Sequence, residues 1–128
     1  MKTVSKEITY YNSKIERMSR EELEALQFKK LQYQLRFVYE NVPMYRRLCQ
    51  DYKLHPDDIK TREDFFQKWP TISKADLIKD QTENPPWGTR VGIPVEKIVQ
   101  VHLTSGTSGL GQEIYANSYL DVEYLGSN

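Results

Sequence analysis

The sequence has little cysteine, no excess charge of either sign and no long apolar run. Cys49 is the one cysteine among 128 residues, which excludes a disulfide framework or a cysteine-based zinc site within the chain. Eighteen basic and eighteen acidic residues cancel, so no net field attracts nucleic acid or an anionic membrane. No segment has the length of a bilayer span or the pattern of a signal peptide. These absences predict a cytoplasmic protein that binds neither nucleic acid nor membrane.

Apolar residues are also scarce for a chain of one domain's length. Hydrophobic residues make up 38% and charged residues 28%, yet nine Tyr, four Phe and two Trp are spread along the chain. This aromatic content argues against disorder. The composition therefore predicts a folded chain that is short of apolar surface for its own core.

Helix-start signals dominate the first part of the chain. Ser19 followed by Glu22 predicts a capping box, and the helix should run to about Asn41 because Pro43 cannot continue it. The same spacing recurs at Thr61 and Asp64, and at Ser73 and Asp76. A further helix is expected from Pro43 to about Asp51.

The long helix expected over residues 19–41 has two apolar faces. A helical wheel places one set on a broad face: Leu23, Phe28, Leu31, Leu35, Val38 and Val42. Leu26, Tyr33 and Phe37 gather roughly opposite. Such a helix needs cover on both sides, which this short chain has little material to supply.

Two β-rich runs follow Pro94, at residues 98–103 and 113–116, and Asn117-Ser118 then has the pattern of a helix cap. Two strands are marginal without further partners. We therefore expect a helical region over 1–92, a β-hairpin over 93–117 and the start of a further helix over 118–128, where the domain is cut short. The expected fold is mainly α-helical with one β-hairpin, the incomplete N-terminal part of a larger domain.

The loop between the two runs is the most informative stretch of the sequence. Hydroxyl side chains alternate with glycines at Thr104, Ser105, Gly106, Thr107, Ser108 and Gly109. Glycine lets a phosphate approach the backbone, and hydroxyl and amide groups supply donors. The loop lacks the Gly-Lys-Ser/Thr ending of a Walker loop. By composition alone, a hairpin loop without a ligand fits as well as an anion-binding loop.

This loop resembles the phosphate loop of the adenylate-forming superfamily, and its flanks resemble phenylacetate–CoA ligases in particular. The resembling stretches occur in family order, at residues 11–12, 15–16, 19–27, 42–47, 55–59, 69–77 and 99–102. A lone glycine-rich loop is a weak signal, whereas this ordered set covers about residues 10–115. The resemblance implies an α/β fold for the complete enzyme.

The resemblance also implies a reaction in two steps, using Mg-ATP and CoA. A carboxylic acid, aryl or otherwise, would attack ATP to form an acyl-adenylate and pyrophosphate, and CoA would then displace AMP. The six loop residues 104–109 would hold the β- and γ-phosphates. No catalytic residue is assigned here, because the family's catalytic Lys is expected outside this chain, and no metal-binding residue is expected within it.

The sequence departs from the family pattern after the second glycine. A Lys-Pro or x-Pro-Lys element is usual there, whereas this chain has Leu110, Gly111 and Gln112. This departure removes a cation that would help to hold ATP. Because the family's adenine-binding segment, ribose-binding Asp and C-terminal domain also have no counterpart here, we expect the chain alone to be inactive and to hold neither ATP nor CoA tightly, its partner being the remainder of its own enzyme. Two alternatives stay open: a non-enzymatic helical module that forms homo-oligomers through its exposed apolar face, and an adenylating relative with an acceptor other than CoA.

Other candidate residues have ordinary structural interpretations beside the functional ones. Arg46 and Arg47 could reach CoA phosphates in a complete enzyme, but exposed helix arginines are commoner. Cys49 is expected to be a small buried hydrophobe rather than a nucleophile. His102 is expected to be satisfied by hydrogen bonds of the strand or loop.

Overall fold

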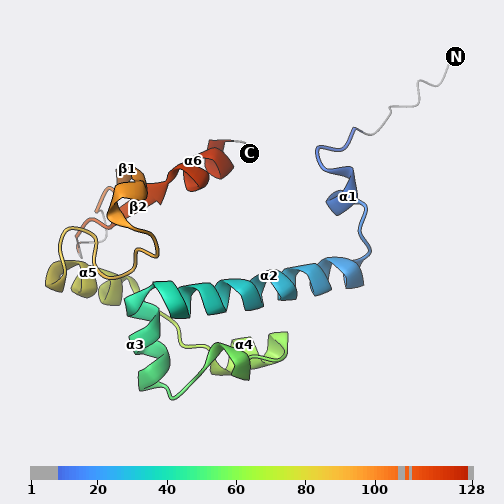
Figure 1. Cartoon of the computed structure of the whole chain (residues 1–128), viewed down its shortest axis with the longest axis horizontal. Coiled ribbons are helices and arrows are strands. Elements are labelled where there is room, and N and C mark those ends of the chain that lie inside the picture. The colour runs from blue at the N-terminus through green and yellow to red at the C-terminus, as the bar shows by residue number, and fades with distance from the viewer. Residues whose placement is uncertain (1–8, 107–108, 110, 127–128) are drawn as a thin grey trace, which may run out of the picture.

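The computed structural model describes residues 9–106, 109 and 111–126, and Figure 1 shows how its elements follow one another. A helical region leads into an antiparallel hairpin, and a last helix follows directly. The elements are α1 (Ser13–Glu16), α2 (Arg20–Asn41), α3 (Pro43–Asp51), η1 (Pro56–Asp58), α4 (Arg62–Lys68), α5 (Lys74–Glu83), η2 (Val95–Lys97), β1 (Ile98–Leu103), β2 (Ile114–Ser118) and α6 (Tyr119–Gly126). The predicted fold, mainly helical with one hairpin, is confirmed.

Reciprocal side-chain caps fix where the principal helices begin. At α2 the Glu22 amide donates to Ser19 Oγ over 3.2 Å, and the Glu22 carboxylate accepts from the Ser19 amide over 2.8 Å. The same capping box begins α4 at Thr61 and α5 at Ser73. Each box satisfies amides that have no partner inside the helix. The predicted starts of these three helices are confirmed.

The apolar core is small and lies where α2, α3 and η1 meet. Leu35, Val42, Cys49 and Ile59 are each at most 4% exposed. The whole chain exposes 10190 Å², against roughly 7,000 Å² expected from the scaling of surface with mass for a compact 15.1 kDa monomer. The chain therefore leaves much of its surface in contact with solvent.

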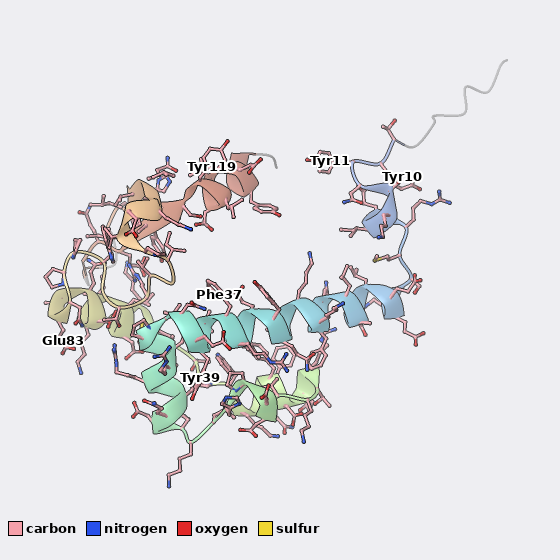
Figure 2. All side chains as sticks on the ribbon, in the orientation of Figure 1. Tyr10, Tyr11, Phe37, Tyr39, Glu83 and Tyr119 are labelled. Carbon is pink, nitrogen blue, oxygen red and sulfur yellow. The ribbon has the colours of Figure 1, made fainter. Side chains whose placement is uncertain are left out.

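The two predicted faces of α2 have different surroundings. Leu35 and the C-cap residue Val42 are buried as the first face requires. On the second face, Phe37 is covered by the segment at Gly92, where an added Cβ would stand 3.2 Å from Phe37 Cε1. Tyr33 is 71% exposed. Figure 2 marks Phe37 on the side of α2 opposite Tyr39, whose ring meets His55 edge-on at 5.0 Å.

The hairpin pairs β1 with β2 in antiparallel register, with Leu103 opposite Ile114 and an irregularity between Ile98 and Gln100. The second strand was predicted over 113–116, but it runs from Ile114 to Ser118, so both predicted ends were wrong. At its start, the Glu113 amide bonds to a side chain, Thr104 Oγ1, instead of continuing the backbone ladder.

The C-terminal end of β2 was mispredicted because the irregularity in β1 lets pairing extend to the last two residues of β2. Asn117 lies opposite Gln100, and Ser118 lies opposite Ile98. Ser118 also caps α6, since its Oγ accepts from the Asp121 amide at 3.3 Å while Asp121 accepts from the Ser118 amide at 2.7 Å. The predicted helix start at this place is confirmed, and the helix packs on both strands.

Candidate phosphate-binding loop

The candidate loop joins β1 to β2 at the end of the hairpin. The structure describes Thr104, Ser105, Gly106 and Gly109 of the predicted set. Thr107 and Ser108 lie outside the described residues, as does Leu110. Ser105 is exposed, and Thr104 is half-buried where the strand ends. The placement of the loop between two strands agrees with the sequence expectation.

Thr104 closes the base of the loop through both its backbone and its side chain. Its amide donates to the Glu113 carbonyl over 3.0 Å, and its Oγ1 accepts from the Glu113 amide over 3.0 Å. A hydroxyl that accepts a hydrogen bond still has its own proton to donate. Thr104 therefore has a structural role at the base of the loop and keeps a donor that a ligand could use.

Gly106 and Gly109 have the backbone conformation that such a loop requires. Their φ angles are 71° and 74°, in the left-handed region where a side chain is costly. The Gly109 amide donates to the Gly106 carbonyl at 3.4 Å, which closes a tight turn. A Cβ on Gly106 would also stand only 2.9 Å from Cγ of Gln112. Glycine is needed at Gly106 for both reasons.

Side chains of the helical region fasten the strand that leaves the loop. Gln81 on α5 donates from Nε2 to the Gln112 carbonyl at 3.0 Å, and its Oε1 accepts from the Ile114 amide at 2.9 Å. Arg90 donates to Gln81 Oε1 at 3.2 Å and also to the Ile114 carbonyl. The base of the loop is thus tied to α5 by a pair of side chains.

Arg90 also contacts the ring of Tyr115, the residue that follows Ile114. The guanidinium carbon lies 4.9 Å from the centre of the Tyr115 ring, a cation–π distance. Its Nη1 is buried and has no hydrogen-bond partner among the described residues. Arg90 therefore has one more donor than the described part of the chain satisfies.

Asp80, next to Gln81, joins three segments of the helical region. It is 7% exposed and accepts from the Thr89 amide at 2.6 Å, from the Thr89 hydroxyl at 2.7 Å and from Arg47 at 3.0 Å. A buried carboxylate needs such donors to offset its lost hydration. The cluster fixes the turn before Arg90 against α3 and α5.

The sequence alone does not reveal the roles of Gln81, Arg90 and Asp80. Their partners lie 9 to 33 residues away along the chain, beyond the reach of helical spacing or cap motifs. One signal was available: Gly88 and Thr89 follow two prolines and so mark a tight turn.

The two arginines considered for CoA contacts both bind groups of this chain. Arg46 donates to the Tyr39 carbonyl at 2.9 Å and to the Glu40 carbonyl, near the end of α2 where carbonyls lack helical partners. Arg47 binds Asp80 and, at 2.6 Å, the Thr89 hydroxyl. The structure thus gives both side chains structural roles.

Cys49 and His102 occupy different environments. Cys49 is fully buried on α3, and burial raises the pKa of its thiol, which agrees with a packing role. His102 lies on β1 opposite Tyr115, with its side chain exposed. Neither residue lies within the loop.

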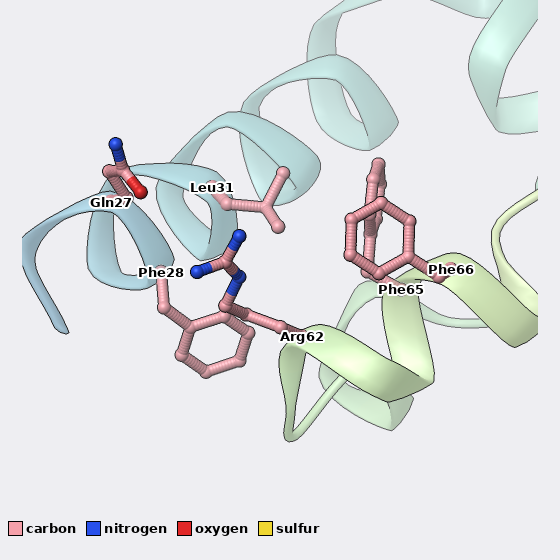
Figure 3. Close-up of a pocket in the computed structure, with 6 residues that line it drawn as sticks. All are labelled: Gln27, Phe28, Leu31, Arg62, Phe65 and Phe66. Carbon is pink, nitrogen blue, oxygen red and sulfur yellow. The ribbon is translucent and has the colours of Figure 1, made fainter. Parts of the chain in front are cut away.

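A groove of about 200 Å³ lies between α2 and α4 (Figure 3). Three residues of each helix line it: Gln27, Phe28 and Leu31 from α2, and Arg62, Phe65 and Phe66 from α4. None of the described loop residues lines it. Over the described ranges, no cluster of His, Cys, Asp and Glu could hold a metal ion, and no helix is long and apolar enough to cross a membrane.

Comparison with proteins of known function points to a single enzyme family, although no family model matches the chain. Over 95 residues the chain is 42% identical to a phenylacetate-coenzyme A ligase of Aromatoleum evansii, and equally to one of Escherichia coli K12. A phenylacetate-coenzyme A ligase of Thermus thermophilus is 35% identical over 99 residues. The chain is homologous to the N-terminal region of proteins named phenylacetate-coenzyme A ligase.

Solved structures of acyl-CoA ligases also resemble this chain. A 2-hydroxyisobutyryl-CoA ligase in the postadenylation state, in complex with 2-HIB-AMP, superposes with a TM-score of 0.75 at 30% identity over 81% of this chain. An open conformation of that ligase in complex with 2-HIB-AMP and CoA gives 0.74 at 29% identity. The chain spans about a fifth of the length of these relatives, between 20% and 22%.

Proposed function

We propose that this chain supplies the phosphate-binding loop of an ATP-dependent, AMP-forming acid–CoA ligase. The enzyme would activate a carboxylic acid as an acyl-adenylate and transfer the acyl group to CoA. The observation that carries the proposal is the glycine turn at Gly106 and Gly109 on the hairpin, in a chain 35–42% identical to phenylacetate–CoA ligases. The relatives and structural neighbours are named as CoA ligases, which supports CoA over another acceptor.

The loop would act by holding the triphosphate tail of ATP while pyrophosphate leaves. Thr104 keeps a hydroxyl proton to donate, Ser105 is exposed, and the backbone at Gly109 is open, since an added Cβ there would meet nothing within 4 Å among the described residues. Fixed donors that meet developing charge lower a barrier without reorganising. Thr107 and Ser108 would add two hydroxyls, as the family resemblance implies.

Magnesium would enter with the nucleotide rather than on a protein cage. Mg²⁺ commonly keeps several waters and is bound through substrate phosphates and one or two carboxylates. We place its carboxylate ligands, the catalytic Lys and the adenine contacts in the remainder of the enzyme. The substrate would be an aryl acid, by analogy with the curated relatives, and the cytoplasmic location expected from the sequence stays a prediction.

A chimera tests the proposed function. The aligned segment of the Escherichia coli phenylacetate–CoA ligase is replaced by this chain, and pyrophosphate release and acyl-CoA formation are measured with phenylacetate and with 2-hydroxyisobutyrate. We expect adenylate and thioester to form with at least one acid. A chimera with a native circular dichroism spectrum and no pyrophosphate release with either acid would overturn the proposal.

Replacing Thr107 with Ala in that chimera tests the loop itself. Losing one donor to the triphosphate should slow adenylate formation by about 10²-fold, as loss of a preorganised donor does elsewhere, with little change in acid binding. An unchanged rate would remove the loop from the chemistry.

A self-associating module is the second candidate function, and the 71% exposure of Tyr33 on α2 favours it. The Tyr33 side chain lies on the second apolar face, so a second copy could cover it. Sedimentation velocity over rising concentration would then show a dimer that Tyr33→Arg dissolves. Tyr52→Arg is the matched control, because Tyr52 is 63% exposed at the end of α3. A monomer at all concentrations would exclude this function.

A further inference from the structure

The hydrogen bonds that attach β2 to α5 follow the pattern that a neighbouring parallel strand would make. In a parallel sheet, a residue donates its amide to the carbonyl of the residue that precedes its cross-strand partner. Its own carbonyl accepts from the amide of the residue that follows that partner. The Gln81 amide does this with Gln112 and Ile114, the residues on either side of Glu113. A side chain thus occupies the place of a strand at the edge of the hairpin.

Arg90 completes this arrangement. Both outward backbone groups of Ile114 are satisfied, the amide by Gln81 and the carbonyl by Arg90, while Arg90 also fixes Gln81 Oε1 at 3.2 Å. The Tyr115 ring, 4.9 Å from the guanidinium carbon, supports Arg90 from the next residue. The three side chains therefore hold one another and leave little freedom to the strand that they bind.

The contacts concentrate on the residues that leave the loop. Gln112 and Ile114 are bound by Gln81, Glu113 faces Lys74 Nζ at 4.0 Å, and a Cβ on Gly111 would lie 3.8 Å from Ile78. Thr104, on the entering side, bonds to Glu113, donating from its amide and accepting at its hydroxyl. The loop is therefore placed relative to the helices mainly through its exit strand.

We propose that Gln81 and Arg90 are the positioning residues of the phosphate-binding loop. They do not touch the nucleotide; they set where the donors of the loop stand relative to the rest of the enzyme. The inference rests on the proposed function, because positioning has a catalytic meaning only if this loop binds the triphosphate. A displacement of about 1 Å at such a site can cost about 10²-fold in rate.

Gln81→Leu in the chimera tests this role, since Leu has a similar size and neither hydrogen bond. We expect the rate of adenylate formation to fall by about 10²-fold, with a higher KM for ATP and unchanged KM values for acid and CoA. Gln81→Glu keeps the acceptor for Ile114 and Arg90, so it should recover part of the loss. Lys79→Gln, an exposed position on the same helix, is the control that should leave all constants unchanged.

A second measurement uses the chain itself and does not depend on activity. Amide hydrogen exchange at Ile114 should become faster in Gln81→Leu and in Arg90→Met, and should stay unchanged in Lys79→Gln. A purely structural role would lower kcat through loss of folded enzyme and leave the KM for ATP unaltered, which would overturn the inference, as would unchanged exchange at Ile114. Failure of the unsubstituted chimera would count against the proposed function, while the exchange result would still decide whether Gln81 and Arg90 hold the strand.

Discussion

Gly88 shows how much a single residue of this chain can control. Its φ of 77° lies in the left-handed region, and a Cβ there would stand 2.2 Å from Asp80 Oδ2. The turn that it forms brings Thr89 to the same carboxylate. One glycine therefore allows both the turn and the buried cluster that receives it.

Gly88→Ala should destabilise the fold by more than the backbone cost of about 1–2 kcal/mol for a left-handed side chain, because Asp80 must also move. Urea unfolding followed by circular dichroism measures the loss. Gly109→Ala is the matched control, since its φ is 74° and an added Cβ meets nothing within 4 Å among the described residues. Equal losses in the two variants would contradict the steric part of this argument.

Cys49 should be inert in the native chain, because its thiol is fully buried and its pKa is raised by that burial. At neutral pH, Ellman's reagent should give no colour with the folded protein and one equivalent of colour after denaturation in urea. Rapid reaction of the folded protein would show that α3 opens readily or that the thiol is accessible.

At the scale of the elements, local patterns predicted what local contacts determine. The capping boxes at Ser19, Thr61 and Ser73 bind within three residues, so sequence spacing alone located the starts of α2, α4 and α5. The loop was found for the same reason, because its glycines and hydroxyls are contiguous.

Long-range contacts account for what the sequence did not predict. The hydrogen bond that the Ile114 amide donates to Gln81 and the ion pair between Arg47 and Asp80 each span 33 residues, and no local pattern marks them. The ends of β2 were mispredicted because a side-chain bond from Thr104 and an irregularity in β1 determine them.

The helix caps predict a loss of stability in acid. Bonds from Lys68 and the Thr61 hydroxyl lower the pKa of Asp64 from 3.8 to about 2, and the Ser73 bonds lower that of Asp76. Since the folded pKa lies below the unfolded one, this stabilisation is present above pH 3.8 and is lost as the pH falls toward 2. Unfolding followed by circular dichroism should show it, and Asp64→Asn should reduce the dependence on pH in that range. The same dependence in the variant would assign the effect to other groups.

At the scale of the whole molecule, exposed area outweighs core. Val101 and Leu103 alternate in the regularly paired part of β1 and are 45% and 60% exposed, so one face of the strand presents apolar side chains to solvent. The buried apolar core around Leu35 and Ile59 is small beside this exposed apolar surface. Under the proposed function, the remainder of the enzyme would cover this face.

The chain alone should bind Mg-ATP weakly or not at all, because the loop is one of several groups that would contact the nucleotide. Isothermal titration calorimetry measures this directly, and inorganic pyrophosphate serves as a probe for the loop alone. Sub-micromolar affinity for Mg-ATP would contradict the assignment of the adenine and ribose contacts to the rest of the enzyme.

Gln81 and Arg90 occupy both outward backbone groups of Ile114, and this limits how the sheet can be enlarged. A strand arriving beside β2 at the loop end would find the amide and the carbonyl of that residue already engaged. A further strand therefore cannot pair with β2 at Ile114, which closes that edge of the sheet at the loop end.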